Sequence, residues 1–89
     1  MNLSLLDMEG YGAVVVSQFT LLADTRKGRR PSYSHAAEPG KALDYYKALI
    51  KHLSDEGIHV ESGVFQSHMD ISYTNDGPVT ILMDSKKMF

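Results

Sequence analysis

The sequence contains no cysteine, so no disulfide can stabilise its fold. A chain without cysteine fits a reducing, cytosolic setting, and we therefore expect a cytoplasmic protein. The chain is also short, and its 89 residues predict one domain, residues 1–89. A domain of this size buries only about two-thirds of its unfolded surface. It needs another source of stability, and oligomerisation is the one that the sequence leaves open.

Long apolar runs are missing as well. The longest, residues 13–23, is interrupted by Ser17, Gln18 and Thr20, so no segment is expected to span a membrane. Residues 1–4 lack the basic region with which a secretory signal begins. We therefore predict no membrane as a partner.

Most catalytic signatures are absent too. There is no nucleophile elbow, no phosphate-binding glycine loop and no cysteine nucleophile. The four histidines lack the spacing of a zinc site, so neither a metal nor another cofactor is predicted; they are His35, His52, His59 and His68. Catalysis, if present, must depend on backbone dipoles and on hydroxyl or amide side chains.

Positive charge is concentrated in one short stretch of the chain. The net charge of −2 argues against nucleic-acid binding over the whole surface. However, four of the nine basic residues lie within five positions: Arg26, Lys27, Arg29 and Arg30. This cluster is either a solvated charge run or a set of phosphate contacts, and composition alone leaves both open.

One helix and several strands are predicted. Residues 13–22 are rich in β-branched and apolar residues and, despite Ser17, Gln18 and Thr20, lack the alternation of a strand with one solvent-facing side, which is typical of a buried central strand. Residues 23–38 lack periodicity and predict a long surface loop. Pro39 suits the first turn of a helix that Gly57 ends. Its apolar face serves packing, and we assign it no chemistry; the face comprises Ala42, Leu43, Tyr46, Leu49, Ile50 and Leu53.

The C-terminal third predicts further strands around a turn. Short strands are expected at residues 58–60 and 64–65, and alternation predicts a strand at 69–74 that returns at 79–83. Asp76-Gly77 between these two strands is typical of a hairpin turn. Pro78 has no N–H to donate to a neighbouring strand. It therefore fits either the start of a strand or a backbone segment that is held in a special conformation. The predicted fold class is α+β, with a mainly antiparallel sheet and one packed helix.

Two motifs carry a family resemblance. Residues 17–32 read SQFTLLADTRKGRRPS and residues 75–80 read NDGPVT, with Gly63-Val64-Phe65 between them. Together they closely resemble the bacterial D-aminoacyl-tRNA deacylases, formerly D-tyrosyl-tRNA deacylases, over residues 2–84. Such enzymes hydrolyse the ester between a D-amino acid and the terminal adenosine of tRNA, and achiral glycine also passes.

The resemblance implies roles for the first motif. Gln18, Phe19 and Thr20 would be catalytic, with the Phe19 N–H suited to an oxyanion and the Thr20 hydroxyl close to the scissile carbonyl. The resemblance leaves two alternatives: the Thr20 hydroxyl is the nucleophile, or the 2′-OH of the tRNA has the activating role. Three further residues would form the pocket wall: Ser17, Phe65 and Met69. The cations Arg26, Lys27, Arg29 and Arg30 would bind tRNA.

The second motif would select the enantiomer. In the family, the residues matching Gly77 and Pro78 form a cis dipeptide whose carbonyls enter the partner subunit's pocket. There they accept from the substrate α-amino group and leave no room for an L side chain. The resemblance therefore implies a homodimer with active sites at its interface.

The chain departs from the family in two respects. It starts where the family's upstream strands and helix end, so we expect an N-terminally truncated member or a gene begun at an internal Met, with the C-terminal portion of the deacylase fold. Gln66, Ser67 and His68 also stand where the family has Gly-Ala-Asp. Two alternatives follow: an inactive remnant that keeps tRNA or RNA binding, and a structural dimerisation module.

Overall fold

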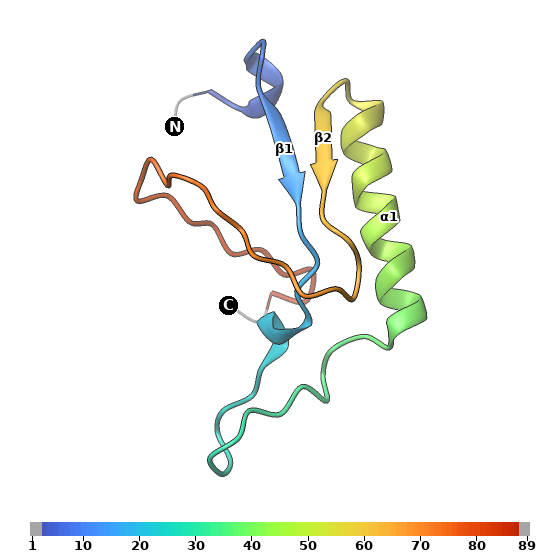
Figure 1. Cartoon of the computed structure of the whole chain (residues 1–89), viewed down its shortest axis with the longest axis vertical. Helices are drawn as coiled ribbons and strands as arrows, with labels where there is room; N and C mark the ends of the chain where they lie inside the picture. Colours follow the sequence, from blue (N-terminus) through green and yellow to red (C-terminus); the bar gives the residue numbers. More distant parts are fainter. Residues whose placement is uncertain (1–2, 88–89) are drawn as a thin grey trace.

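The fold is one strand–helix–strand unit with long irregular segments attached. The computed structural model describes residues 3–87. Strand β1 spans Gly12–Val15, helix α1 spans Pro39–Asp55 and strand β2 spans His59–Ser62. Two 3-10 helices, η1 at Leu5–Asp7 and η2 at Phe19–Leu22, flank β1. The two strands lie side by side, with α1 packed along β2 (Figure 1).

The two strands are parallel because the long α1 crossover returns the chain to the start of the sheet. Gly12 pairs with His59 and Val15 pairs with Ser62. The Gly63 N–H extends the ladder by donating to the Val15 carbonyl at 3.2 Å. Gly12 suits the close approach, because a Cβ there would lie 2.6 Å from the His59 carbonyl oxygen.

Helix α1 forms as the sequence predicted. Pro39 begins it, and the preceding Glu38 side chain accepts from the N–H groups of Gly40 at 3.0 Å and Lys41 at 2.6 Å. Gly57, with a φ of 84°, ends it in the left-handed conformation. Most of the predicted apolar face is half-buried, and Leu49 is its one exposed member.

The prediction of a mainly antiparallel sheet is wrong. The described residues contain one sheet, and its two strands are parallel. The predicted buried strand over residues 13–22 is wrong as well, because β1 ends at Val15 and η2 follows. A continuous apolar run is stable as a buried strand only where other strands flank it on both sides. Within residues 3–87, β2 is the one strand that pairs with β1. The chain therefore leaves the sheet after Val15 and forms η2.

The segment at residues 69–83 extends away from the body and returns to it (Figure 1). No strand is formed there among the described residues, although the alternation predicted a hairpin. The Gly77–Pro78 peptide bond is cis, as the resemblance implies. Met69 is half-buried, but the large apolar residues from Ile71 to Met83 are 45–87% exposed, among them Tyr73, Val79 and Ile81. The segment thus presents apolar surface outside the strand–helix–strand unit.

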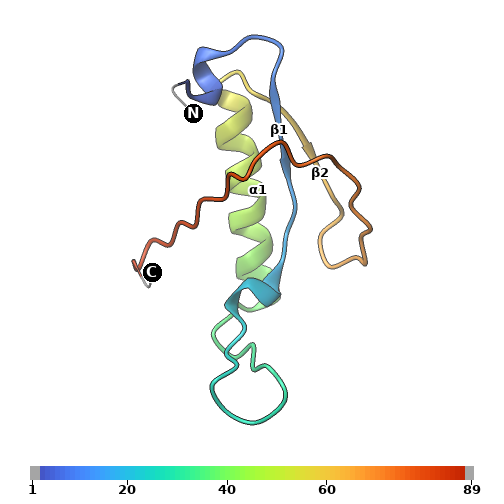
Figure 2. The same ribbon diagram turned by 90° about the vertical axis from the view of Figure 1, so that its left-hand side faces the viewer.

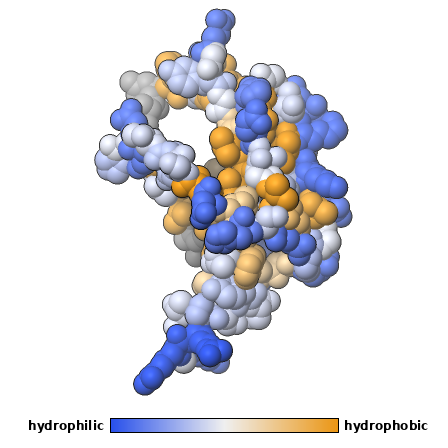
Figure 3. Space-filling view, in the orientation of Figure 1, coloured by the Kyte–Doolittle hydropathy of each residue, from blue (hydrophilic) through white to orange (hydrophobic). Residues whose placement is uncertain are grey.

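Within residues 3–87, no side chain is fully buried. Half-buried residues gather where α1 meets β1 and β2, and apolar atoms are concentrated in that region of the surface (Figure 3). Seen from the side, α1 lies against the strands, while the loop at residues 23–38 and the C-terminal segment project away (Figure 2). None of the helices in the described part combines the length and the apolar character needed to cross a membrane.

Candidate functional site

A cavity of about 640 Å³ lies next to the ends of the two strands. One side is formed by the residues that follow β1, and the other by the residues that follow β2. The start of α1 and the end of the loop complete it. The lining residues are Ser17, Gln18, Phe19, Tyr33, Ala36, Ala37, Pro39, Ala42, Phe65, Gln66, Ser67, His68 and Met69. Five of these were predicted for the catalytic and pocket-wall set.

The first motif forms one wall of the cavity. The backbone of Gln18 is extended, with φ −155° and ψ 99°, and η2 begins directly after it at Phe19. The Gln18 side-chain amide donates to the Thr20 hydroxyl. Thr20 does not itself line the cavity, but this hydrogen bond joins it to a residue that does. The arrangement therefore groups an amide and a hydroxyl side chain at the start of η2.

Phe19 is part of this wall. Its side chain is 63% exposed and meets the Tyr33 ring edge to face, with ring centroids 5.0 Å apart. Among residues 3–87, the Phe19 N–H has no hydrogen-bond acceptor. An N–H without an internal acceptor is available to an oxygen of a bound ligand.

The opposite wall is a turn after β2. The Ser67 N–H donates to the Val64 carbonyl at 3.2 Å, and Gln66 has a positive φ of 63°. The Phe65 ring stacks on that of Tyr46, with centroids 5.6 Å apart. The Met69 thioether covers Gly63 so closely that a Cβ at Gly63 would overlap with its sulfur.

The three residues that differ from the family pattern lie in this wall. Gln66, Ser67 and His68 all line the cavity, so they form part of its surface. His68 lies 3.4 Å from Asp70, and both side chains are almost fully exposed. In the part of the chain that the structure describes, no three potential ligand side chains are grouped as a metal site would require.

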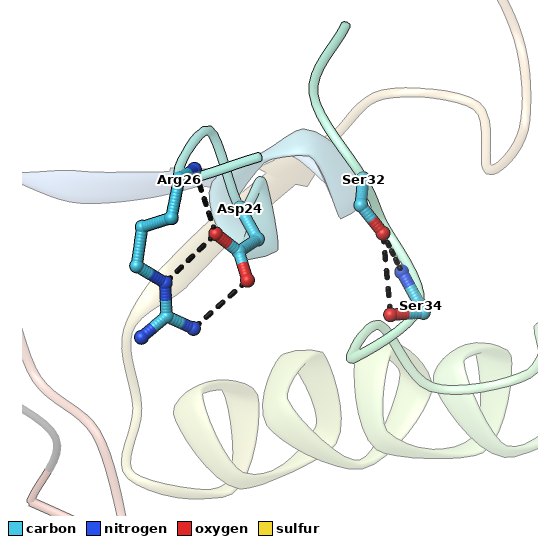
Figure 4. Close-up of polar contacts among 4 residues, drawn as sticks. All are labelled: Asp24, Arg26, Ser32 and Ser34. Carbon is cyan, nitrogen blue, oxygen red and sulfur yellow. Dashed lines mark hydrogen bonds and ion pairs between the residues drawn. The ribbon is translucent and has the colours of Figure 1, made fainter. Parts of the chain in front are cut away.

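The basic loop, the part of the loop between Asp24 and Ser32 that carries the four cations, is closed at its base. Asp24 and Ser32 exchange two backbone hydrogen bonds of 2.7 and 2.8 Å. The Asp24 carboxylate accepts from the Arg26 guanidinium at 2.9 and 2.8 Å and from the Arg26 backbone N–H at 3.0 Å (Figure 4). Across the base, the Ser34 N–H donates to the Ser32 hydroxyl at 3.4 Å.

This ion pair changes the charge that the loop presents. The hydrogen bonds donated by Arg26 lower the pKa of Asp24 well below its ordinary value, and the same bonds raise the pKa of Arg26. Both groups are therefore charged at neutral pH and largely cancel each other. Within the described residues, no carboxylate pairs with Lys27, Arg29 or Arg30. The positive end of the loop is the strongly hydrophilic tip in Figure 3.

A second hollow, of about 650 Å³, adjoins this loop. It is lined by Asp24, Arg26, Lys27, Ser32, Ser34 and His35. Two of the four predicted tRNA-binding residues, Arg26 and Lys27, thus lie on it.

Gly77 and Pro78 are not part of either hollow. Both are exposed, on the projecting segment, and they do not line the cavity of their own chain. A Cβ at Gly77 would lie 2.6 Å from the Val79 backbone nitrogen, so glycine fits the tight backbone here.

Sequence reasoning missed two aromatic residues. Tyr33 lines the cavity and contacts Phe19, and its one sequence signal is its position directly after Ser32, the last residue of the first motif. Tyr46 stacks on Phe65 behind the wall, and helical periodicity identified it as packing alone.

Known proteins resemble this chain over the part that carries both motifs. The sequence model of the D-Tyr-tRNA(Tyr) deacylase family matches residues 1–84. The chain is 60% identical over 89 residues to a D-aminoacyl-tRNA deacylase of Kosmotoga olearia, of which it covers 59%. It is 54% identical to that of Clostridioides difficile over 89 residues, again covering 59%, and 56% identical to that of Bacillus pumilus over 87 residues, covering 58%. All of this chain is covered in the first two cases and 98% in the third.

The chain thus spans somewhat more than half the length of these relatives. The family match nevertheless covers both motifs and the cavity between them. The chain belongs to the D-Tyr-tRNA(Tyr) deacylase family.

Proposed function

We propose that this chain acts in the hydrolysis of D-aminoacyl-tRNA, releasing free D-amino acid and tRNA. The reaction would serve chiral proofreading in the cytoplasm, where aminoacyl-tRNA is used for translation. The observation that carries the proposal is the cavity that joins Ser17, Gln18 and Phe19 to Phe65 and Met69. The names of the relatives, D-aminoacyl-tRNA deacylase, agree with it.

The chemistry follows from the first wall of the cavity. Water adds to the ester carbonyl carbon, and the carbonyl oxygen becomes an oxyanion that accepts from the Phe19 N–H. The bond from carbon to the ribose oxygen then breaks, and the ribose oxygen takes up the proton that the attacking water gives up. One oxyanion donor lowers such a barrier by about 3 kcal/mol. The Gln18–Thr20 hydrogen bond supports a fixed position for the Thr20 hydroxyl near the same carbonyl.

Chiral selection would come from a second subunit. Gly77 and Pro78 are exposed on the projecting segment, which supports their insertion into a partner's cavity rather than their own. The exposed apolar side chains on that segment favour a homodimer. Backbone carbonyls there would accept from the α-amino group and exclude an L side chain, so glycine would still be hydrolysed.

The basic loop would contact the tRNA backbone. Lys27, Arg29 and Arg30 lie in an exposed stretch beyond the Asp24–Ser32 bridge. Phosphate contacts of this kind position the nucleic acid without reading its sequence.

The test is release of D-tyrosine and L-tyrosine from their tRNA esters by the purified chain. The full-length Kosmotoga olearia relative serves as a positive control, and Thr20→Val removes one hydroxyl at nearly constant volume. Hydrolysis of the D-ester alone, reduced about a hundredfold in Thr20→Val, is the expected result. Salt-sensitive tRNA binding without hydrolysis would instead support the RNA-binding remnant.

A further inference from the structure

One hydroxyl on α1 faces the ends of both strands. The Tyr46 hydroxyl lies 3.1 Å from the Gly63 carbonyl oxygen and 3.4 Å from the Val15 carbonyl oxygen. Both contacts are part-buried, where a hydrogen bond is worth more than at an exposed surface. The Val15 carbonyl also accepts from the Gly63 N–H at 3.2 Å. Tyr46 therefore completes a small network at the point where β1 and β2 both end.

The two halves of the cavity start from this network. Val15 lies two positions before Ser17, where one wall begins, and Gly63 lies two positions before Phe65 in the other wall. The Tyr46 ring stacks on Phe65 at 5.6 Å, with an angle of 29° between the ring planes. Met69 in turn covers Gly63. A shift of the Tyr46 side chain would therefore move both walls.

The geometry points to Tyr46 as a positioning residue that holds the two walls at a fixed separation. This inference rests on the function proposed above. Tyr46 does not line the cavity, so it acts through Gly63 and Phe65 rather than on the substrate. Helix periodicity assigned this residue to packing, but a purely apolar contact would not need its hydroxyl.

The matched variants are Tyr46→Phe and Tyr45→Phe. Both remove one phenolic oxygen from adjacent positions of α1. Tyr45 is 66% exposed, and its ring contacts the Lys41 ammonium at 5.9 Å. Tyr46→Phe keeps the ring that stacks on Phe65, so it tests the hydroxyl alone.

Two readouts are measured on the 89-residue chain. The first is kcat and KM for D-tyrosyl-tRNA, where Tyr46→Phe should lower kcat about fivefold and leave KM almost unchanged. The second is the backbone amide chemical shifts, which should change at residues 17–19 and 65–69 together. Tyr45→Phe should change neither.

The positioning role of Tyr46 is contradicted by either of two results. Amide shifts confined to α1 in Tyr46→Phe, or a fall in kcat that only follows the loss of folded protein, would overturn it. If the wild-type chain does not hydrolyse the ester, the proposed function fails, and the amide shifts alone decide the role of Tyr46. Coupled changes in both walls would then still support it, and unchanged walls would refute it.

Discussion

Replacing Asp24 with Asn should strengthen tRNA binding and make it more dependent on salt. Asp24 holds the Arg26 guanidinium by two hydrogen bonds of 2.9 and 2.8 Å, so Arg26 presents little net charge to a phosphate. Asn at this position keeps the backbone bridge to Ser32 but removes the negative charge. Arg26 then becomes a fourth available cation beside Lys27, Arg29 and Arg30.

The size of the effect follows from counterion release. Each phosphate contact contributes about 0.7 to 0.9 to the slope of log affinity against log salt. Three contacts predict a slope of about −2 to −3 for the wild-type chain. Asp24→Asn should steepen it by about one contact, while Arg26→Ala should change it far less than Arg29→Ala does.

The assay is fluorescence polarisation of labelled tRNA between about 50 and 200 mM KCl. Asp55→Asn is the control, because Asp55 also pairs with a cation, Lys51 at 2.7 Å, but on the exposed face of α1. It should leave the slope unchanged. The reasoning is refuted if Arg26→Ala flattens the slope as much as Arg29→Ala, since Arg26 would then contact phosphate itself.

Three further predictions concern stability and association. Arg26→Met should raise the pKa of Asp24 toward its ordinary value of 3.8, as carboxyl carbon-13 NMR can measure. Because the folded pKa is the lower one, the pair stabilises the fold above pH 3.8, and this contribution is lost as the pH falls through the folded value. Gly12→Ala should lower the thermal midpoint, because its Cβ would lie 2.6 Å from the His59 carbonyl oxygen; unchanged melting would contradict this. Gly40→Ala, which meets only a flexible side chain at 3.3 Å, should not lower it. The isolated chain should be poorly stable or associate irregularly in sedimentation, and a sharply melting, clean dimer would show otherwise.

Helix α1 could be predicted because its signals are local. Pro39 fixes a backbone angle suited to the first turn, Gly57 provides the left-handed stop, and the apolar spacing between them marks one face. Each of these properties acts within a few residues. The structure accordingly places the helix within two residues of the predicted limits.

The strands could not be predicted in the same way. Alternation along residues 69–74 describes how side chains would point in a sheet, but a strand exists only where another strand pairs with it. Leu21, predicted inside a buried strand, is 80% exposed in η2. Which strand pairs with another depends on the whole fold, and the alternation within one segment carries no information about its partner.

The candidate site was predictable where motifs carried it. Gln18, Phe19 and Phe65 were assigned from the family resemblance, and the cavity brings them together. Tyr33 and Tyr46 lack a motif of their own, so their roles depend on contacts with Phe19 and Phe65 that only the folded chain reveals.

The parallel order of β1 and β2 is what makes the cavity possible. In a parallel pair both strands end at the same edge, so the chains that follow β1 and β2 leave from neighbouring positions. In an antiparallel pair of the same four residues, they would leave from opposite ends, about 13 Å apart. Phe19 and Phe65 could not then line one cavity without a further rearrangement. The correction to the sheet therefore supplies the reason that two motifs far apart in the sequence form one site.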